Sequence, residues 1–154
     1  MVRENSSSMC LVVFLQNSWS PVYAGTTWPR ASWLLALQRS RSGQRLKILT
    51  RDFEVCENTT PIVGPTASSK VPPDEAHIQR VLARTRPTIV IACGKQAETV
   101  LAKLWAGALI AVPHPAHRFL TDALYIEAKK LLNEGFAGRI KLHQEIGKVE
   151  RIDL

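Results

Sequence analysis

Polar side chains that can take part in chemistry stand directly after apolar runs of this sequence. His114 and His117 belong to the stretch Pro-His-Pro-Ala-His, which follows the apolar run 108–112. An imidazole can donate or accept a hydrogen bond and can stabilise a developing charge. Gln16 and Asn17 stand where an earlier apolar run ends, and their amides offer both a donor and an acceptor.

Two further polar positions fit the same description. Asn58 lies in the long segment 51–73, which is rich in Pro, Thr, Ser and Gly, and segments of that length in a compact domain are often functional. Gly94 and Lys95 follow the apolar run 88–93, where glycine allows a tight turn into a helix and lysine can reach a phosphate.

The elements that must position these residues alternate along the chain. Continuous apolar runs predict buried strands at 10–16, 45–50, 88–93 and 108–112. Helical spacing of apolar residues predicts helices at 30–41, 73–85, 95–104 and 120–135, and the tail 139–154 reads as an edge strand or an appendage. This alternation predicts an α/β fold: a three-layer α/β/α sandwich with a central, mainly parallel four-stranded sheet.

A parallel sheet gathers the ends of its strands. Ligands bind such sheets outside the carboxyl ends of the strands. The loops after residues 16, 50, 93 and 112 should therefore bring the polar groups named above to one edge of the sheet.

Length and composition set the frame for this sheet. The chain of 154 residues suits one domain, so we expect a flexible polar N-terminus at 1–8 and a single domain at 9–154. The apolar run 9–15 is short for a secretory signal and fits a buried strand, and no run approaches membrane-spanning length.

Net charge bears on which partners the protein could bind, and the cysteines bear on metal sites and disulfides. A net charge of +7 makes DNA or another polyanion a plausible partner, although an ordinary basic surface has the same composition. Cys10, Cys56 and Cys93 lack the spacing of a zinc site or a disulfide framework, so we expect buried thiols in a reducing cytoplasm. We expect no metal and no cofactor.

The order of these motifs resembles the uracil-DNA glycosylase superfamily over residues 10 to about 132. The segment 86–119 carries most of the resemblance: "RPTIVIACGKQAETVLAKL" resembles the family's strand–glycine–helix, and "PHPAHRFL" resembles its His-Pro signature. "FLQNSWSP" stands where the first signature belongs, and "CENTTP" stands where the family has an asparagine that reads the uracil edge.

The resemblance implies a DNA glycosylase of base excision repair. Such an enzyme flips uracil or a related damaged base out of the stack and hydrolyses its N-glycosidic bond, without metal. By position, the resemblance implies that His114 donates to the leaving base, that Asn17 holds the water and that Asn58 reads the base.

Other positions receive supporting roles from the same resemblance. The expected substrate contacts are Gln16, Trp19, Tyr23, Phe53 and Asn58, where the three aromatic residues compete to stack on the base. The expected DNA contacts are Lys95, Ala116, His117, Arg118 and Phe119, of which Arg118 and Phe119 stand at the family's wedge loop.

The sequence also departs from the family pattern. Leu15 replaces the signature glycine, Asn17 replaces the aspartate of the most active branch, and Ala116 replaces a serine. An amide cannot act as a general base, so catalysis by Asn17 would depend on positioning the water.

Two other functions remain open at this point. One is a catalytically inactive protein of the same fold that binds DNA or a nucleobase. The other is a nucleoside-processing transferase or hydrolase, which would need a carboxylate such as Asp52, Glu54 or Glu57 at the site. For each of these functions we expect a cytoplasmic monomer that does not bind membranes.

Overall fold

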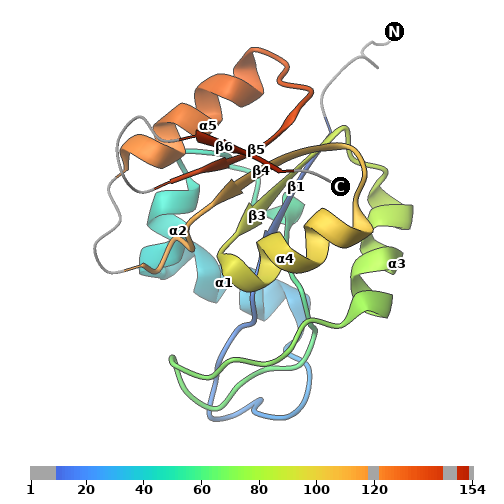
Figure 1. The fold of residues 1–154 in the computed structure, drawn as a ribbon. Helices are drawn as coiled ribbons and strands as arrows, with labels where there is room; N and C mark the ends of the chain where they lie inside the picture. The colour runs from blue at the N-terminus through green and yellow to red at the C-terminus, as the bar shows by residue number, and fades with distance from the viewer. Residues whose placement is uncertain (1–9, 118–121, 144–148, 153–154) are drawn as a thin grey trace, which may run out of the picture.

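The protein is an α/β domain built on one mostly parallel sheet (Figure 1). The computed structural model describes residues 10–117, 122–143 and 149–152. Its sheet order is β2-β1-β3-β4-β5-β6, in which β6 alone is antiparallel to its neighbour. The strands are β1 (Leu11–Leu15), β2 (Cys56–Asn58), β3 (Ile89–Cys93), β4 (Ala108–Val112), β5 (Arg139–Leu142) and β6 (Val149–Arg151).

Helices cover both faces of this sheet and complete three layers (Figure 1). The helices are α1 (Arg30–Arg39), α2 (Arg41–Leu46), α3 (Glu75–Thr85), α4 (Lys95–Leu104) and α5 (Ala123–Asn133), with a short 3-10 turn, η2 (Phe53–Val55). Alternate strand residues face opposite layers. Val13 and Ile91 pack with α1, α2 and α5, whereas Val12 and Val90 pack with α3 and α4.

The fold class is therefore the expected one, but the sheet has six strands where four were predicted. Three of the predicted strands are present as β1, β3 and β4, and the tail adds β5 and β6. β5 continues the parallel sheet beside β4, and β6 closes that side as an antiparallel edge.

The strand predicted at 45–50 is wrong. These residues form the end of α2 and a following turn. Leu46 and Leu49 are both buried three positions apart, which is a helical spacing, whereas a strand would bury alternate residues. The expected place in the sheet is taken by β2, a short strand within the segment predicted as a long loop.

The helix predicted at 30–41 is broken into α1 and α2. Ser40 lies between them in an extended conformation, and its side chain accepts a hydrogen bond from Gly43 N at 3.0 Å as the N-cap of α2. Gly43 lies inside α2 where the two helices meet, since a Cβ there would lie 1.8 Å from the Leu37 carbonyl oxygen.

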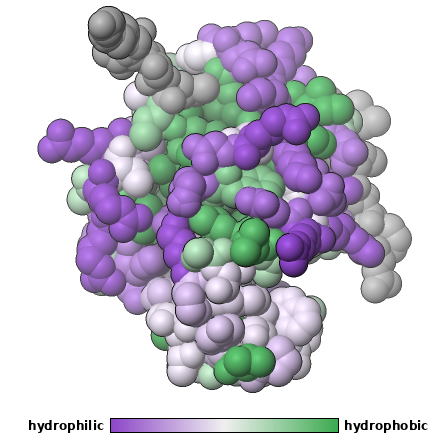
Figure 2. Space-filling view, turned by 180° about the vertical axis from the view of Figure 1, so that it is seen from behind, coloured by the Kyte–Doolittle hydropathy of each residue, from purple (hydrophilic) through white to green (hydrophobic). Residues whose placement is uncertain are grey.

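Two long loops form a lobe beyond the carboxyl ends of β1 and β2 (Figure 1). Gly64 N donates to Ser18 O at 2.9 Å, and Ser20 N donates to Gly64 O at 2.9 Å, so residues 18–27 and 61–64 run side by side. The stretches 17–29 and 59–73 contain one charged residue, Lys70. The lobe is accordingly the pale region at the bottom of Figure 2.

Candidate functional site

The strand registers bring the expected polar positions together. Leu15 pairs with Asn58 at the end of β1 and β2, so Gln16 and Asn17 follow directly beside Asn58. Cys93 pairs with Val112 at the end of β3 and β4, which places Gly94 beside the loop that carries His114. The chain runs from β1 outward to β2 and then returns to β3, and this reversal is where α/β sheets bind ligands.

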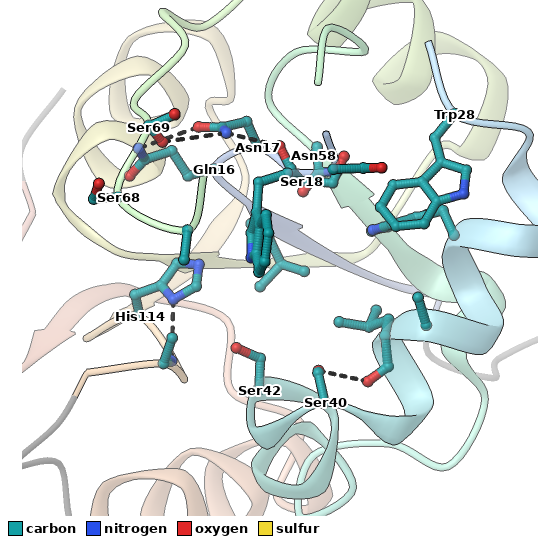
Figure 3. A pocket seen from close by; sticks show the side chains of 18 of the residues that line it. Gln16, Asn17, Ser18, Trp28, Ser40, Ser42, Asn58, Ser68, Ser69 and His114 are labelled. Carbon is teal, nitrogen blue, oxygen red and sulfur yellow. Dashed lines mark hydrogen bonds between the residues drawn. The ribbon is translucent and has the colours of Figure 1, made fainter. Parts of the chain in front are cut away.

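A cavity of about 700 Å³ opens at this point. Figure 3 shows Gln16, Asn17 and His114 on one side of it, with Trp28 on the opposite side. Its lining residues come from the end of β1, the two loops of the lobe, α1 and α2, the end of β2 and the loop after β4: Leu15, Gln16, Asn17, Ser18, Trp19, Ser20, Pro21, Trp28, Trp33, Ala36, Leu37, Ser40, Ser42, Asn58, Ala67, Ser68, Ser69, Lys70, His114 and Ala116.

His114 is held in one protonation state by its surroundings. Burial, and secondly the charge of nearby His117, lowers the pKa of His114 from 6.5 to about 4, so the ring is neutral at physiological pH. Its Nδ1 accepts a hydrogen bond from Ala116 N at 3.1 Å, so the ring proton must lie on Nε2. Within residues 10–117, 122–143 and 149–152, no hydrogen bond to Nε2 is found.

Hydrogen bonds from α2 and α5 hold the loop that carries His114. Tyr125 of α5 donates from its hydroxyl to Pro113 O at 2.7 Å, and Arg45 of α2 donates from Nη1 to Pro115 O at 2.7 Å. His117 N closes the turn on His114 O at 2.9 Å. The imidazole is therefore positioned by two helices and by its own loop.

Gly94 permits the close approach of β3 to this histidine. It has φ +97°, a conformation open to glycine, and a Cβ there would lie 3.3 Å from His114 Cβ. Gly94 N also donates to Val112 O at 2.8 Å. The glycine that was expected to serve a tight turn thus also makes room for the imidazole.

Asn58 presents an unengaged amide to the cavity. Its backbone is fixed, because Asn58 O lies 3.1 Å from His77 Nε2 and the neighbouring Thr59 N donates to Leu15 O at 3.2 Å. No hydrogen bond of its side-chain amide is found among the described residues. The NH2 group, with two donors, and the carbonyl oxygen of this amide are thus left to meet a ligand.

Asn17 differs from Asn58 in this respect. Its side chain lines the cavity, but its Nδ2 donates to Ser18 O at 2.9 Å and to Ser69 O at 3.3 Å. Its Oδ1 accepts from Val71 N at 3.1 Å and from Gln16 Nε2 at 3.3 Å. Figure 3 shows part of this network beside Ser69.

Of the other expected substrate contacts, two line the cavity and two do not. Gln16 and Trp19 line the cavity, and Trp19 is 48% exposed at its mouth. Tyr23 does not line it and stacks on Trp28, with ring centroids 5.3 Å apart. Phe53 is buried in the core on the α1 side, because the 3-10 turn directs it inward, and it does not line the cavity.

The expected DNA contacts also divide. Ala116 lines the cavity, whereas Lys95 is exposed at the first residue of α4 and His117 is exposed on the loop after β4. Arg118 and Phe119 lie outside the described residues, as does the N-terminal segment 1–8.

The sequence interpretation missed one wall of the cavity. Trp33, Ala36, Leu37 and Ser40 line it from α1 and its C-cap, together with Trp28 from the preceding loop. The spacing i, i+3, i+4, i+7 is visible in the sequence and predicts one helix face. That this face meets a cavity depends on the lobe.

A smaller cavity of about 160 Å³ shares lining residues with the first, and the acidic residue Glu57 lines it. Glu57 pairs there with Arg30 at 2.8 Å and with Arg84 at 3.3 Å, and His77 Nε2 lies 3.8 Å from its Oε1. Its carboxylate is thus committed to cations. None of the described residues that line the larger cavity is an aspartate or a glutamate.

No protein-family model, curated protein or solved structure matches this chain. In the described part of the chain, no three His, Cys, Asp or Glu side chains are grouped to hold a metal ion. Among the described helices, none is both long and apolar enough to cross a membrane. The functional conclusion therefore depends on the geometry of the larger cavity.

Proposed function

We propose that this protein is a DNA glycosylase that hydrolyses the N-glycosidic bond of uracil or a related damaged base in DNA, as in base excision repair. One observation carries the proposal: a neutral imidazole with its proton on Nε2, His114, shares a cavity with the unengaged amide of Asn58. A hydrogen-bond donor and a base-reading amide are two of the groups that such a reaction needs.

The donor acts on the leaving base. When the C1′–N1 bond breaks, negative charge develops on the departing uracil and its O2 becomes a strong acceptor. His114 Nε2–H can donate to that oxygen, and because the loop and two helices hold the ring, little reorganisation is needed. A pKa of about 4 keeps the ring neutral, so the donor is present throughout the physiological pH range.

The amide reads the base. The Asn58 side chain can donate to uracil O4 and accept from N3–H, a pairing that cytosine mismatches at both atoms. A base reaches this position only after leaving the stack, and an aromatic face stabilises it there. Trp19, half exposed at the mouth of the cavity, supports that stacking role.

An amide at the end of β1 would hold the attacking water. Gln16 and Asn17 both line the cavity and are bonded to each other. An amide orients a water molecule without taking its proton, so the rate would depend on positioning.

The two alternative functions differ in what the cavity offers them. A nucleoside-processing enzyme with a carboxylate nucleophile finds none on the described lining, and Glu57 is paired with arginines. A catalytically inactive base-binding protein would have the same pocket without turnover, so an assay must separate it from the glycosylase.

The test is base excision from oligonucleotides that contain uracil, hypoxanthine or a thymine mismatch, followed by alkaline cleavage at abasic sites. We expect wild-type cleavage and a loss of about 100-fold or more in His114→Ala, with duplex affinity retained. Asn58→Ala should lose uracil excision in the same way. His143→Ala, a histidine paired with Glu150 at 2.7 Å, and Asn133→Ala are the matched controls.

Wild-type protein that binds the oligonucleotides but leaves every base in place would favour the inactive binding protein. Full excision by His114→Ala would remove the imidazole from the mechanism.

A further inference from the structure

The Asn17 side-chain amide has no hydrogen-bonding capacity left. A primary amide offers two N–H donors and an oxygen with two lone pairs. Asn17 uses both donors on Ser18 O and Ser69 O, and its oxygen accepts from Val71 N and Gln16 Nε2. The backbone partners fix the orientation of the amide, since Ser69 O only accepts and Val71 N only donates. A water molecule at Asn17 would have to displace one of these bonds.

Two of the four bonds reach residues 52 and 54 positions further along the chain. They join the end of β1 to the segment 66–71, whose residues Ala67 to Lys70 line the cavity. The segment also closes on itself, with Ser69 N donating to Thr66 O at 3.1 Å. Gly64 packs against both Asn17 and Ser69, because a Cβ there would lie 2.6 Å from Ser69 Cβ and 3.3 Å from Asn17 Nδ2. Asn17 therefore anchors this segment over the cavity.

Gln16 has the capacity that Asn17 lacks. Its Nε2 donates to Asn17 Oδ1, so the nitrogen faces Asn17 and the oxygen Oε1 faces the other way. Among the described residues, no hydrogen bond to that oxygen is found. Gln16 lines the same cavity as His114.

We infer that Asn17 is a positioning residue that anchors the segment 66–71, and that Gln16 Oε1 holds the attacking water. The second half rests on the proposed function. Gln16 accepts a hydrogen bond from the water, whose oxygen forms the new bond to C1′ as the C1′–N1 bond breaks. The electron pair of that bond stays on N1 of the base, His114 donates to O2, and the proton that the water loses ends on the released base.

The substitution Asn17→Asp separates the two roles by the sign of its effect. A carboxylate at a water-holding position would act as a general base and raise the excision rate. A carboxylate at an anchor cannot donate to Ser18 O and Ser69 O and is repelled by both. We expect Asn17→Asp to lose about 100-fold in excision because the cavity wall is displaced. A rate above wild type would overturn the inference.

Trypsin cleavage after Lys70 measures the anchor without any activity. Lys70 is exposed within the segment, so release of Asn17 should speed its cleavage severalfold in Asn17→Asp and in Asn17→Ala. Ser68→Ala is the matched control, because Ser68 lies in the same segment and its Oγ contacts Thr66 Oγ1 rather than Asn17. Cleavage at the wild-type rate in folded Asn17→Ala would overturn the anchor.

Gln16→Ala completes the test. We expect excision to fall by about 100-fold while cleavage at Lys70 stays close to wild type. Full excision by Gln16→Ala would overturn the assignment of the water. Wild-type protein that excises no base would overturn the proposed function and the Gln16 role together, whereas the anchor would still be decided by the cleavage rates.

Discussion

At the scale of single residues, the surroundings of each side chain decide which chemistry is available to it. His114 and His143 are the same residue type, but His114 lines the cavity and accepts from a loop amide, while His143 pairs with the Glu150 carboxylate. Asn17 and Asn58 differ in the same way, since the first amide is bonded within the protein and the second has no hydrogen bond among the described residues. Residue type alone would have assigned each pair one role.

The depressed pKa of His114 makes stability depend on pH. Between pH 6.5 and about 4 the unfolded chain protonates this histidine while the folded chain does not. We expect its contribution to the free energy of unfolding to be complete above pH 6.5 and to be lost as the pH falls toward 4, by on the order of 3 kcal/mol. Urea unfolding of wild type and His114→Gln across this range measures it, and parallel curves would contradict it.

The cysteines give a second prediction at this scale. Burial raises the pKa of Cys56 to about 12 and that of Cys93 to about 12, whereas Cys10 is exposed. The thiolate is the reactive form. A disulfide reagent should therefore label one thiol rapidly in the native protein and all three after unfolding. Rapid labelling of Cys56 or Cys93 in the folded state would contradict their burial.

At the scale of the elements, Gly94 at the end of β3 and the Tyr125 hydroxyl on α5 are two of the groups that position the loop that carries His114. Neither residue lines the cavity, but each acts on the loop that carries His114. Substitution of either residue should therefore change the excision rate by moving His114.

Gly94→Ala adds a methyl group at a residue with positive φ, close to the His114 side chain. We expect a loss of about 1–3 kcal/mol in the free energy of unfolding from the positive φ, and displacement of His114 by the new Cβ. Gly135→Ala is the matched control, since Gly135 has φ +72° with nothing within 4 Å. Urea unfolding should show similar losses, whereas excision should fall only in Gly94→Ala.

Tyr125→Phe removes one hydroxyl and leaves Pro113 O without its donor. We expect a loss of about 1 kcal/mol in stability and a lower excision rate, because the loop that carries His114 is less firmly held. Tyr23→Phe is the control, as no hydrogen bond of the Tyr23 hydroxyl is found in the part of the chain that the structure describes. Equal stability of the two variants would argue against the fastening role of Tyr125.

At the scale of the whole molecule, charge and shape are distributed unevenly. The net charge is +7, but the lobe beside the cavity carries one charged residue over residues 17–29 and 59–73. Figure 2 shows the pale lobe below a body that is strongly hydrophilic around its edges and apolar in the middle of this face. Any attraction to DNA must therefore come from the body of the domain.

DNA affinity should consequently fall steeply with salt. Lysine and arginine side chains that neutralise phosphates release bound counterions, so contact with about six phosphates would cost on the order of a thousandfold in affinity between about 50 and 200 mM salt. Fluorescence anisotropy with a labelled duplex measures this slope. A flat response would show that the basic surface does not contact the phosphate backbone.

Local patterns in the sequence predict much of this fold. Buried strands such as β1, β3 and β4 are continuous apolar runs, and α3 and α4 have apolar stripes at helical spacing, so each is recognisable within a dozen residues. The positions of Gln16, Asn17 and His114 at one edge follow from the parallel order of the strands, and all three line the cavity. Asn58 joins them at the end of β2, a strand that was not predicted from the sequence.

Contacts between distant segments decided the rest. The run 45–50 has a strand-like composition, but packing of Leu46 and Leu49 against the core makes it helix and turn, and the short β2 enters the sheet through its neighbour β1. The protonation of His114 depends on its burial, and the commitment of Asn17 depends on Ser69 and Val71. Periodicity reports only what neighbouring residues share, whereas desolvation and hydrogen bonds across more than fifty positions exist only once the chain has folded.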